Sequence, residues 1–338
     1  MSVGESIEEQ AQEFAARYKA VYQQLGRVIV GHSDILNGVL TCLFVGGHCL
    51  LEGVPGLGKT LLIRTLAETL DLKFSRIQFT PDLMPADILG TNMVVESPEG
   101  GRVFQFQKGP IFTQICLADE INRATPKTQS AMLETMQEKK VSIAGKVFPM
   151  ELPFFVMATQ NPLEQEGTYP LPEAQLDRFF FKLLVGYSNR KELAEIIDRT
   201  TKDVIITPDK VMDGAEILKW QDLIREVIVA PHVQDYIVRL TLATHPEGEF
   251  ATESTNKYLR WGSSPRGAQT ITLAAKVRAL LGGRYNVSFE DIRRVFLPAL
   301  RHRIILNFEA EAEGIEPDQV LIDILKKVPE KSDDSKVA

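Results

Sequence analysis

Cysteine and histidine are both scarce in this sequence of 338 residues. Its three cysteines, Cys42, Cys49 and Cys116, form no C-x-x-C pair, and the last two lie in apolar, strand-like runs. We therefore expect them to be buried small hydrophobic side chains in a protein of the reducing cytoplasm. The five histidines show no metal-ligand spacing, so each is expected to be structural.

Long apolar runs and an excess of basic charge are also missing. The longest apolar candidate, residues 38–51, is broken by Gly46, Gly47 and His48 and is shorter than the ~20 residues that a membrane span needs. Residues 1–18 are polar and acidic, which disfavours a signal peptide. The net charge is -7, whereas general nucleic-acid binders usually present a basic face. Membrane insertion is therefore not expected, and nucleic-acid binding is disfavoured.

Strand-like and helical patterns alternate in the first half of the chain. Helices are expected at residues 7–24 and 33–44, and five short apolar runs follow at residues 48–52, 73–79, 112–118, 154–159 and 179–185. This alternation predicts an α/β fold, in which a mostly parallel sheet is covered by helices on both faces. Residues 92–107 and 140–150 interrupt the rhythm and are predicted hairpins, turning at 97–101 and 144–146.

The pattern is helical after Val185. Helices are expected at residues 191–200, 211–228, 232–244, 265–281 and 288–305, the last with a capping-box-like start at Ser288. The sequence therefore predicts an α/β domain over residues 1–187, an all-helical domain over 188–328, and a disordered charged tail over 329–338.

A phosphate-binding loop of the form G-x-x-x-x-G-K-T follows the first predicted strand. It consists of Gly53, Val54, Pro55, Gly56, Leu57, Gly58, Lys59 and Thr60, and a predicted helix begins at Leu61. Backbone N–H groups of such a loop and the helix N-terminus wrap phosphates, the lysine reaches the β- and γ-phosphates, and the threonine hydroxyl binds Mg²⁺. The context of strand, loop and helix predicts an ATP-hydrolysing P-loop protein.

Polar side chains follow two later strands. Asp119 and Glu120 end an apolar strand, an arrangement in which the first acid holds Mg²⁺ and the second polarises the attacking water. Asn161 ends the next strand and could position the water or the γ-phosphate. Alternatively, it caps a turn before Pro162.

Two arginines stand out by position. Arg178 opens the last predicted strand, where a buried ion pair would be its structural role. Arg266 lies in the first turn of a predicted helix, where acids are preferred, so an anionic ligand would account for it.

Taken together, the phosphate-binding loop, the two acids, Asn161 and the two arginines resemble the AAA+ ATPases, and specifically the MoxR-type group. The resemblance covers roughly residues 28–303. The most specific stretches are residues 117–124, Leu-Ala-Asp-Glu-Ile-Asn-Arg-Ala, and residues 158–179. The resemblance implies a helical lid after the α/β core, and a sensor-1 strand between the P-loop strand and the Walker B strand. The implied roles are a Walker A motif at residues 53–60, Walker B at Asp119 and Glu120, sensor 1 at Asn161, an arginine finger acting on the neighbouring subunit at Arg178, sensor 2 at Arg266, and adenine packing at Val30 and Gly31.

The same resemblance implies a function: an oligomeric chaperone-like machine, expected to be a hexameric ring. It would use ATP and Mg²⁺ to remodel or activate a client protein, often one with a von Willebrand A domain, through the two hairpins. Arg123 is a further candidate for reaching across a subunit boundary. Two alternatives stay open: a nucleic-acid motor or loader, and an ATP-gated scaffold with little hydrolysis.

Overall fold

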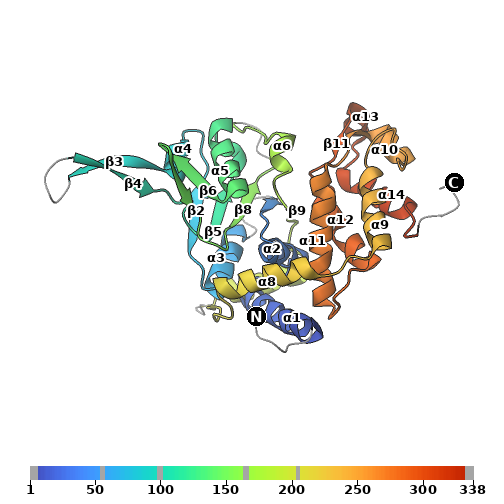
Figure 1. Ribbon diagram of the computed structural model, residues 1–338, viewed down its shortest axis with the longest axis horizontal. Coiled ribbons are helices and arrows are strands. Elements are labelled where there is room, and N and C mark those ends of the chain that lie inside the picture. The colour runs from blue at the N-terminus through green and yellow to red at the C-terminus, as the bar shows by residue number, and fades with distance from the viewer. Residues whose placement is uncertain (1–6, 54–57, 97–101, 163–166, 203–205, 332–338) are drawn as a thin grey trace.

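The computed structural model describes residues 7–53, 58–96, 102–162, 167–202 and 206–331. At its centre lies a sheet of five parallel strands in the order β2-β5-β8-β1-β9 (Figure 1). Their bounds are β1 Cys49–Glu52, β2 Phe74–Gln78, β5 Ile115–Asp119, β8 Phe155–Gln160 and β9 Phe181–Leu184. The predicted α/β class is confirmed, and so is the expected position of β8 between β5 and β1.

Both faces of this sheet are buried, because successive residues of a strand point to opposite sides. Cys49 and Leu51 of β1 belong to one apolar cluster, whereas Leu50 belongs to the other. The first cluster is shared with α1 (Ile7–Val28), α2 (Ser33–Phe44) and α3 (Lys59–Thr69). The second is shared with α4 (Pro85–Leu89) and α5 (Pro126–Glu138). This double burial explains the nearly continuous apolar runs of the strands.

Two antiparallel hairpins leave the sheet region. The longer one pairs β3 (Gly90–Glu96) with β4 (Arg102–Lys108) and projects far from the body (Figure 1). The shorter one pairs β6 (Lys140–Ile143) with β7 (Lys146–Pro149), and its turn places Ala144 and Gly145 at positive φ. Both hairpins are confirmed, although the turn expected at residues 97–101 lies outside the described residues.

The second half of the chain is mainly helical, as expected for a lid. Its helices are α7 Arg190–Thr200, α8 Gly214–Glu226, α9 Pro231–Leu242, α10 Glu253–Tyr258, α11 Pro265–Leu281, α12 Phe289–Leu300, α13 Phe308–Glu313 and α14 Pro317–Lys327. The predicted capping box at Ser288 is present. Beyond the prediction, β10 (Leu259–Trp261) pairs with β11 (Ile305–Leu306), so α12 ends at Leu300 rather than near residue 305.

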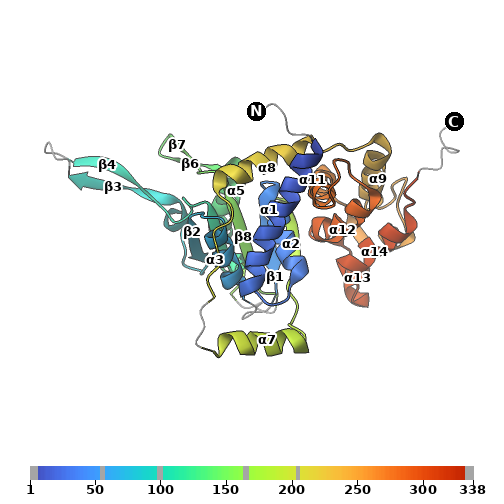
Figure 2. The same cartoon turned by 90° about the horizontal axis from the view of Figure 1, so that it is seen from below.

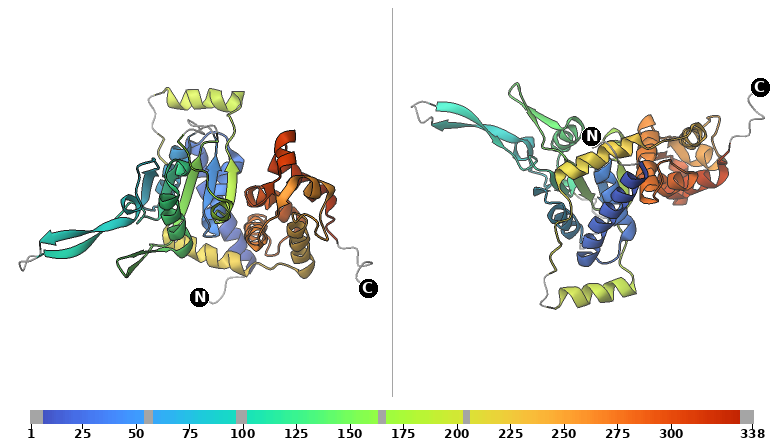
Figure 3. Two further views of the ribbon diagram at one scale, coloured as in Figure 1. Left: turned by 90° about the horizontal axis from the view of Figure 1, so that it is seen from above. Right: turned by 60° about the horizontal axis from the view of Figure 1, so that its bottom comes forward.

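One apolar cluster joins the two halves of the chain. Phe14 of α1 packs edge-on against Phe44 and Trp220, with ring centroids 5.4 and 5.6 Å apart. Arg17 adds an ion pair of 2.5 Å to Glu216 at the start of α8. Helix α8 runs along one side of the sheet region toward the C-terminal helices in both views of Figure 3. Because the core is shared, the domain boundary near residue 187 stays a prediction. Residues 332–338 of the expected tail lie outside the described residues.

Helix α7 stands apart from this core. None of its residues is buried, and Figure 2 shows it beyond the end of the sheet. It is tied to the end of α1 through Arg199, whose guanidinium donates to the Arg27 carbonyl at 2.6 Å.

Within the described ranges, no helix is long and apolar enough to cross a membrane. The three cysteines are free and buried, as expected.

His48 illustrates the structural role predicted for the histidines. Its Nδ1 accepts a hydrogen bond of 3.0 Å from the Val156 N–H, and its Nε2 lies 3.0 Å from the Met136 carbonyl oxygen. A neutral ring with its proton on Nε2 satisfies both partners. Burial lowers the pKa of His48 from its ordinary value of 6.5 to about 4.

Acidification should therefore destabilise the fold. Because the folded pKa of His48 is lowered, its contribution is complete above pH 6.5 and is lost as the pH falls toward 4. At pH 5.5 the loss in the free energy of unfolding should be about 1.4 kcal/mol, measured by urea denaturation. His48→Gln should reduce this pH dependence, whereas a change at exposed His232 should not. An unchanged pH dependence in His48→Gln would contradict the account.

Candidate functional site

The phosphate-binding loop leaves the carboxyl end of β1. Gly53 follows this strand directly, and Gly58 at φ 74° leads into α3, which begins at Lys59. The predicted nucleotide contacts Pro55, Gly56 and Leu57 lie outside the described residues. Thr60 and Leu61 follow in the first turn of α3, and Leu61 is 46% exposed. The described part of the loop thus has the expected strand-to-helix geometry.

Lys59 is held against the start of its own loop. Its ammonium donates a hydrogen bond of 2.6 Å to the Gly53 carbonyl. Burial lowers the pKa of Lys59, while the nearby carboxylates of Asp119, Glu120 and Glu52 act to raise it. In the structure, the predicted phosphate-binding lysine thus lies close enough to the two predicted Walker B acids for their charges to act on its pKa.

Thr159 connects the tips of β5 and β8. Its hydroxyl donates to Asp119 Oδ1 at 2.6 Å and accepts from the Glu120 N–H at 2.8 Å. It is only 1% exposed, so these two bonds replace its contacts with water. No motif singles out Thr159, although its position in the register beside Asp119 and Glu120 would have predicted the contact.

Two side chains of the neighbouring strand β2 bind the same acids. Arg76 Nη2 donates to Asp119 Oδ2 at 2.7 Å, and Gln78 Nε2 donates to Glu120 Oε2 at 2.8 Å. Arg123 also reaches Glu120 Oε2, at 3.1 Å. Arg76 and Gln78 lie two residues apart and therefore share a face of β2, but their sequence carries no recognised signal. Glu120 itself has φ 56°, so its backbone is left-handed directly after the strand.

Asn161 and the predicted adenine segment flank this edge. Asn161 is 7% exposed and follows β8 directly, beside β5 on one side and β1 on the other. Val30 is also buried. Gly31, at φ 70°, lies under α7, where an added Cβ would be 2.4 Å from the Glu192 carboxylate. Its positive φ favours glycine at this position, whereas the Glu192 side chain could move aside.

The two predicted arginines lie at the other end of the sheet. Arg178 and Arg266 line one cavity of about 270 Å³, together with Gly47 and His48, which precede β1. The phosphate-binding loop leaves the opposite end of the same strand. At about 3.3 Å per residue, the length of the strands separates the two ends by roughly 15 Å. The structure therefore brings the two arginines together but not to the phosphate-binding loop of their own chain.

Asp177 accounts for the unusual position of Arg266. Its carboxylate accepts from Arg303 Nε at 2.9 Å, from Ser264 Oγ at 3.0 Å and from Arg266 Nη1 at 3.5 Å. Burial lowers the pKa of Arg303 to about 10, although Asp177 acts to raise it. The buried ion pair considered for Arg178 is thus formed by Asp177 and Arg303, and no described residue forms an ion pair with Arg178.

Comparisons with known proteins agree with this arrangement. The family model described as ATPase family associated with various cellular activities (AAA) matches residues 48–181, and a model of the AAA lid domain matches residues 251–324. The chain is 42% identical to Chaperone MoxR1 of Mycobacterium tuberculosis over 92% of this chain and 81% of that protein. It is 29% identical to Protein MoxR of Methylorubrum extorquens over 90% of this chain and 92% of that protein.

The chain belongs to the MoxR-type AAA+ ATPases. A crystal structure of a candidate ATPase from Cytophaga hutchinsonii supports the assignment, with a TM-score of 0.88 and 43% identity over 95% of this chain and 97% of the other. AAA+ core and lid are therefore the correct description of the α/β region and the helical region.

The donor set of this MoxR-type ATPase fits a magnesium nucleotide. The Thr60 hydroxyl and the Asp119 carboxylate are hard oxygen donors, which Mg²⁺ prefers, and the Asp119 side chain is 15% exposed and thus still accessible. Lys59 adds the positive charge that phosphate oxygens require.

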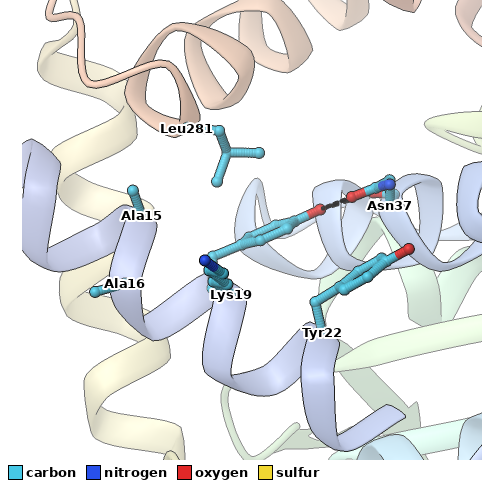
Figure 4. A pocket seen from close by; sticks show the side chains of 7 residues that line it. Ala15, Ala16, Lys19, Tyr22, Asn37 and Leu281 are labelled. Atoms are coloured by element: carbon cyan, nitrogen blue, oxygen red, sulfur yellow. Dashed lines mark hydrogen bonds between the residues drawn. The ribbon is translucent and has the colours of Figure 1, made fainter. Parts of the chain in front are cut away.

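A separate pocket lies between α1, α2 and α11, and it lacks the donors that a magnesium nucleotide needs (Figure 4). It is lined by Ala15, Ala16, Tyr18, Lys19, Tyr22, Asn37 and Leu281, of which only Lys19 is charged. No candidate site residue contributes to it.

Removing the Thr159 hydroxyl should loosen the two acids. Thr159→Val leaves the Glu120 N–H without its acceptor and Asp119 without a donor, so the free energy of unfolding should fall by about 1–3 kcal/mol in urea denaturation. Thr159→Ser keeps the hydroxyl and should lose much less. A loss in Thr159→Ser with little or none in Thr159→Val would show that methyl packing, rather than the bridge, matters at this position.

Proposed function

We propose that the chain hydrolyses ATP to ADP and phosphate, with Mg²⁺ as cofactor, in a homo-oligomeric ring whose sites are each shared by two copies. The supporting observation is the separation of charges along the sheet. Lys59, Asp119 and Glu120 lie at the carboxyl ends of the strands, whereas Arg178 and Arg266 lie at the amino ends. A ring in which one end of the sheet faces the other end in the next copy, here taken as a hexamer, would complete every site.

The first half of the proposed site binds the nucleotide and prepares the water. Lys59 would bind the β- and γ-phosphates, and Thr60 and Asp119 would hold Mg²⁺, which would neutralise charge on the phosphate oxygens. Glu120 would accept the proton of the attacking water, and Asn161 would orient that water or the γ-phosphate. The bridge through Thr159 holds the backbone of Glu120 relative to Asp119, which limits the movement of the base.

Val30 and Gly31 would pack against adenine. Leu61, together with the loop residues Gly53, Pro55, Gly56, Leu57 and Gly58, would complete the nucleotide contacts. Gln78 and Arg76 bind the two acids from β2, so binding of a magnesium nucleotide would have to compete with the Arg76 ion pair for Asp119.

The second half of the proposed site supplies cations to a neighbouring copy. Arg178 and Arg266 would stabilise the charge that develops on the transferred phosphoryl group. For such enzymes an arginine supplied across an interface is worth about 10³–10⁵ in rate. Their common cavity and the roughly 15 Å between the ends of the sheet support action in trans for both arginines.

A chaperone-like role for this ring, acting on a client protein in the cytoplasm, is supported by the hairpins and by the named relative. Phe104 at 77% exposed, with Val94, Met93 and Val103, presents apolar side chains to solvent on β3 and β4. Such surfaces are typical of binding sites for other proteins. A client with a von Willebrand A domain is the partner we would test first, and the free, buried thiols fit the reducing cytoplasm.

Aromatic side chains of both hairpins also contact Phe112, which lies just before β5, the strand that carries Asp119. Phe106 of β4 stacks on Phe148 of β7, with ring centroids 4.2 Å apart, and lies 5.8 Å from Phe112, which precedes β5. Movement of the β5 tip during hydrolysis could therefore reach both hairpins together.

Glu120→Gln should separate binding from chemistry. The amide is nearly the same shape as the carboxylate but cannot accept the proton of the water, so ATP binding should persist while turnover falls below about 1% of wild type. Fluorescent nucleotide binding and phosphate release would measure the two quantities. Lys59→Ala is the control that should lose binding. Near-normal turnover in Glu120→Gln would remove Glu120 from this role.

Mixtures of inactive variants should reveal which residues act in trans. Arg178→Ala mixed with Glu120→Gln should regain activity, because the P-loop half of one copy can meet the intact Arg178 of the other. Arg266→Ala mixed with Glu120→Gln should do the same. Arg178→Ala mixed with Arg266→Ala should stay inactive, since no copy offers both arginines. Recovery in that last mixture would show that one of the two arginines acts within its own chain, and the first two mixtures would tell which one.

A further inference from the structure

The cavity lined by Arg178 and Arg266 contains two further basic residues. Its charged lining consists of Lys139, Arg178, Arg266 and Arg303 against one acid, Asp177. The acid already binds Arg303 and Arg266. Arg178 comes from the segment before β9, Arg266 from α11 and Arg303 from the segment after α12. Lys139 comes from the end of α5. Separate parts of the chain thus place basic groups around one space.

Lys139 occupies a backbone position that favours glycine. It terminates α5 at φ 51°, in the left-handed region, which side chains with a Cβ disfavour. Its N–H donates to the Thr135 carbonyl, and its own carbonyl accepts from the Met150 N–H, each at 2.9 Å. The backbone is therefore fixed on both sides. A lysine here costs conformational energy that a glycine would avoid, so its side chain is expected to contribute something else.

No described acid compensates the ammonium of Lys139. Burial, followed by repulsion from Arg225, lowers its pKa, and no carboxylate acts in the opposite direction. Lys59 differs, because three acids act to raise its pKa. The adjacent Lys140 differs as well, since it is exposed and pairs with Glu138 at 3.5 Å. Lys139 is thus a half-buried cation that no described acid compensates. It lines the cavity of Arg178 and Arg266, and the charge that acts on its pKa, Arg225 of α8, lies outside that lining. An anion in the cavity would stabilise its ammonium.

We propose that Lys139 is a third cation acting in trans, which contacts the terminal phosphate of ATP bound by the neighbouring copy alongside Arg178 and Arg266. This inference rests on the shared site proposed above. Phosphate oxygens gain from several converging donors, and an ammonium can contact them from a side that two planar guanidinium groups leave open. The fixed backbone of Lys139 holds the base of its side chain at the cavity wall before the neighbour arrives.

Two substitutions at this position test the proposal without depending on folding. Lys139→Met removes the charge and keeps the length, whereas Lys139→Gly also relieves the left-handed backbone. Lys139→Gly should unfold at the same or a higher urea concentration than wild type, yet both variants should lose turnover by about 10²-fold. Lys140→Met is the matched control and should keep normal turnover. Lys139→Arg should restore part of the rate.

Assembly gives a readout that is independent of turnover. In the Glu120→Gln background, ATP should promote association in sedimentation velocity, and adding Lys139→Met should raise the ATP concentration needed for half-maximal assembly about tenfold. Adding Lys140→Met should not. Equal behaviour of the two lysine variants would overturn the role of Lys139 and leave the role of Arg178 untouched.

Mixing experiments separate this inference from the shared site itself. Lys139→Met with Glu120→Gln should regain activity, whereas Lys139→Met with Arg178→Ala should not, because both basic groups must come from one copy. Recovery in the second mixture would mean that Lys139 acts within its own chain, which contradicts the proposal. If Arg178→Ala with Glu120→Gln also fails in rings that form, the shared site is wrong, not only the role of Lys139.

Discussion

Five strands that run in the same direction impose a polarity on this molecule. Every strand begins at the edge where Arg178 and Arg266 share a cavity, and every strand ends at the edge where Asp119, Glu120 and the start of the phosphate-binding loop meet. The hydrogen-bonded register fixes the distance between the two edges, and no rotation of side chains spans it. Both sets of groups belong to the site proposed above, and the structure of one chain holds them at opposite edges.

The direction of the strands also links the proposed site to the two hairpins and to the lid. The β5 strand carries Asp119 at one end, and Phe112 lies just before its other end, in contact with the aromatic side chains of both hairpins. The lid carries Arg266 and is joined to the core by the buried contacts of Phe14 and Trp220 and by the ion pair of Asp177 with Arg303. A change at the proposed site would therefore have physical routes to the exposed hairpin surface and to the lid.

The sequence predicted the five strands of the central sheet, both hairpins and the acids at the carboxyl end of β5, because apolar runs and loop glycines depend on local chemistry. It did not predict β10 and β11. It did not indicate Thr159, Arg76 or Gln78, since ordinary polar residues become informative only when the pairing of β2 and β8 with β5 is known. It also could not show that Asp177 supplies the acid beside Arg266, because the two residues lie 89 positions apart in the chain. Lys139 was missed for a different reason: its left-handed backbone appears only in three dimensions.

The central claim is that each catalytic site is assembled from two copies. It is tested most directly by measuring ATP turnover per chain over a wide range of protein concentration, with sedimentation velocity on the same samples. The account predicts that turnover per chain rises with the fraction of assembled protein and vanishes where only single chains sediment. A turnover per chain that stays constant down to concentrations at which the protein is entirely monomeric would contradict it.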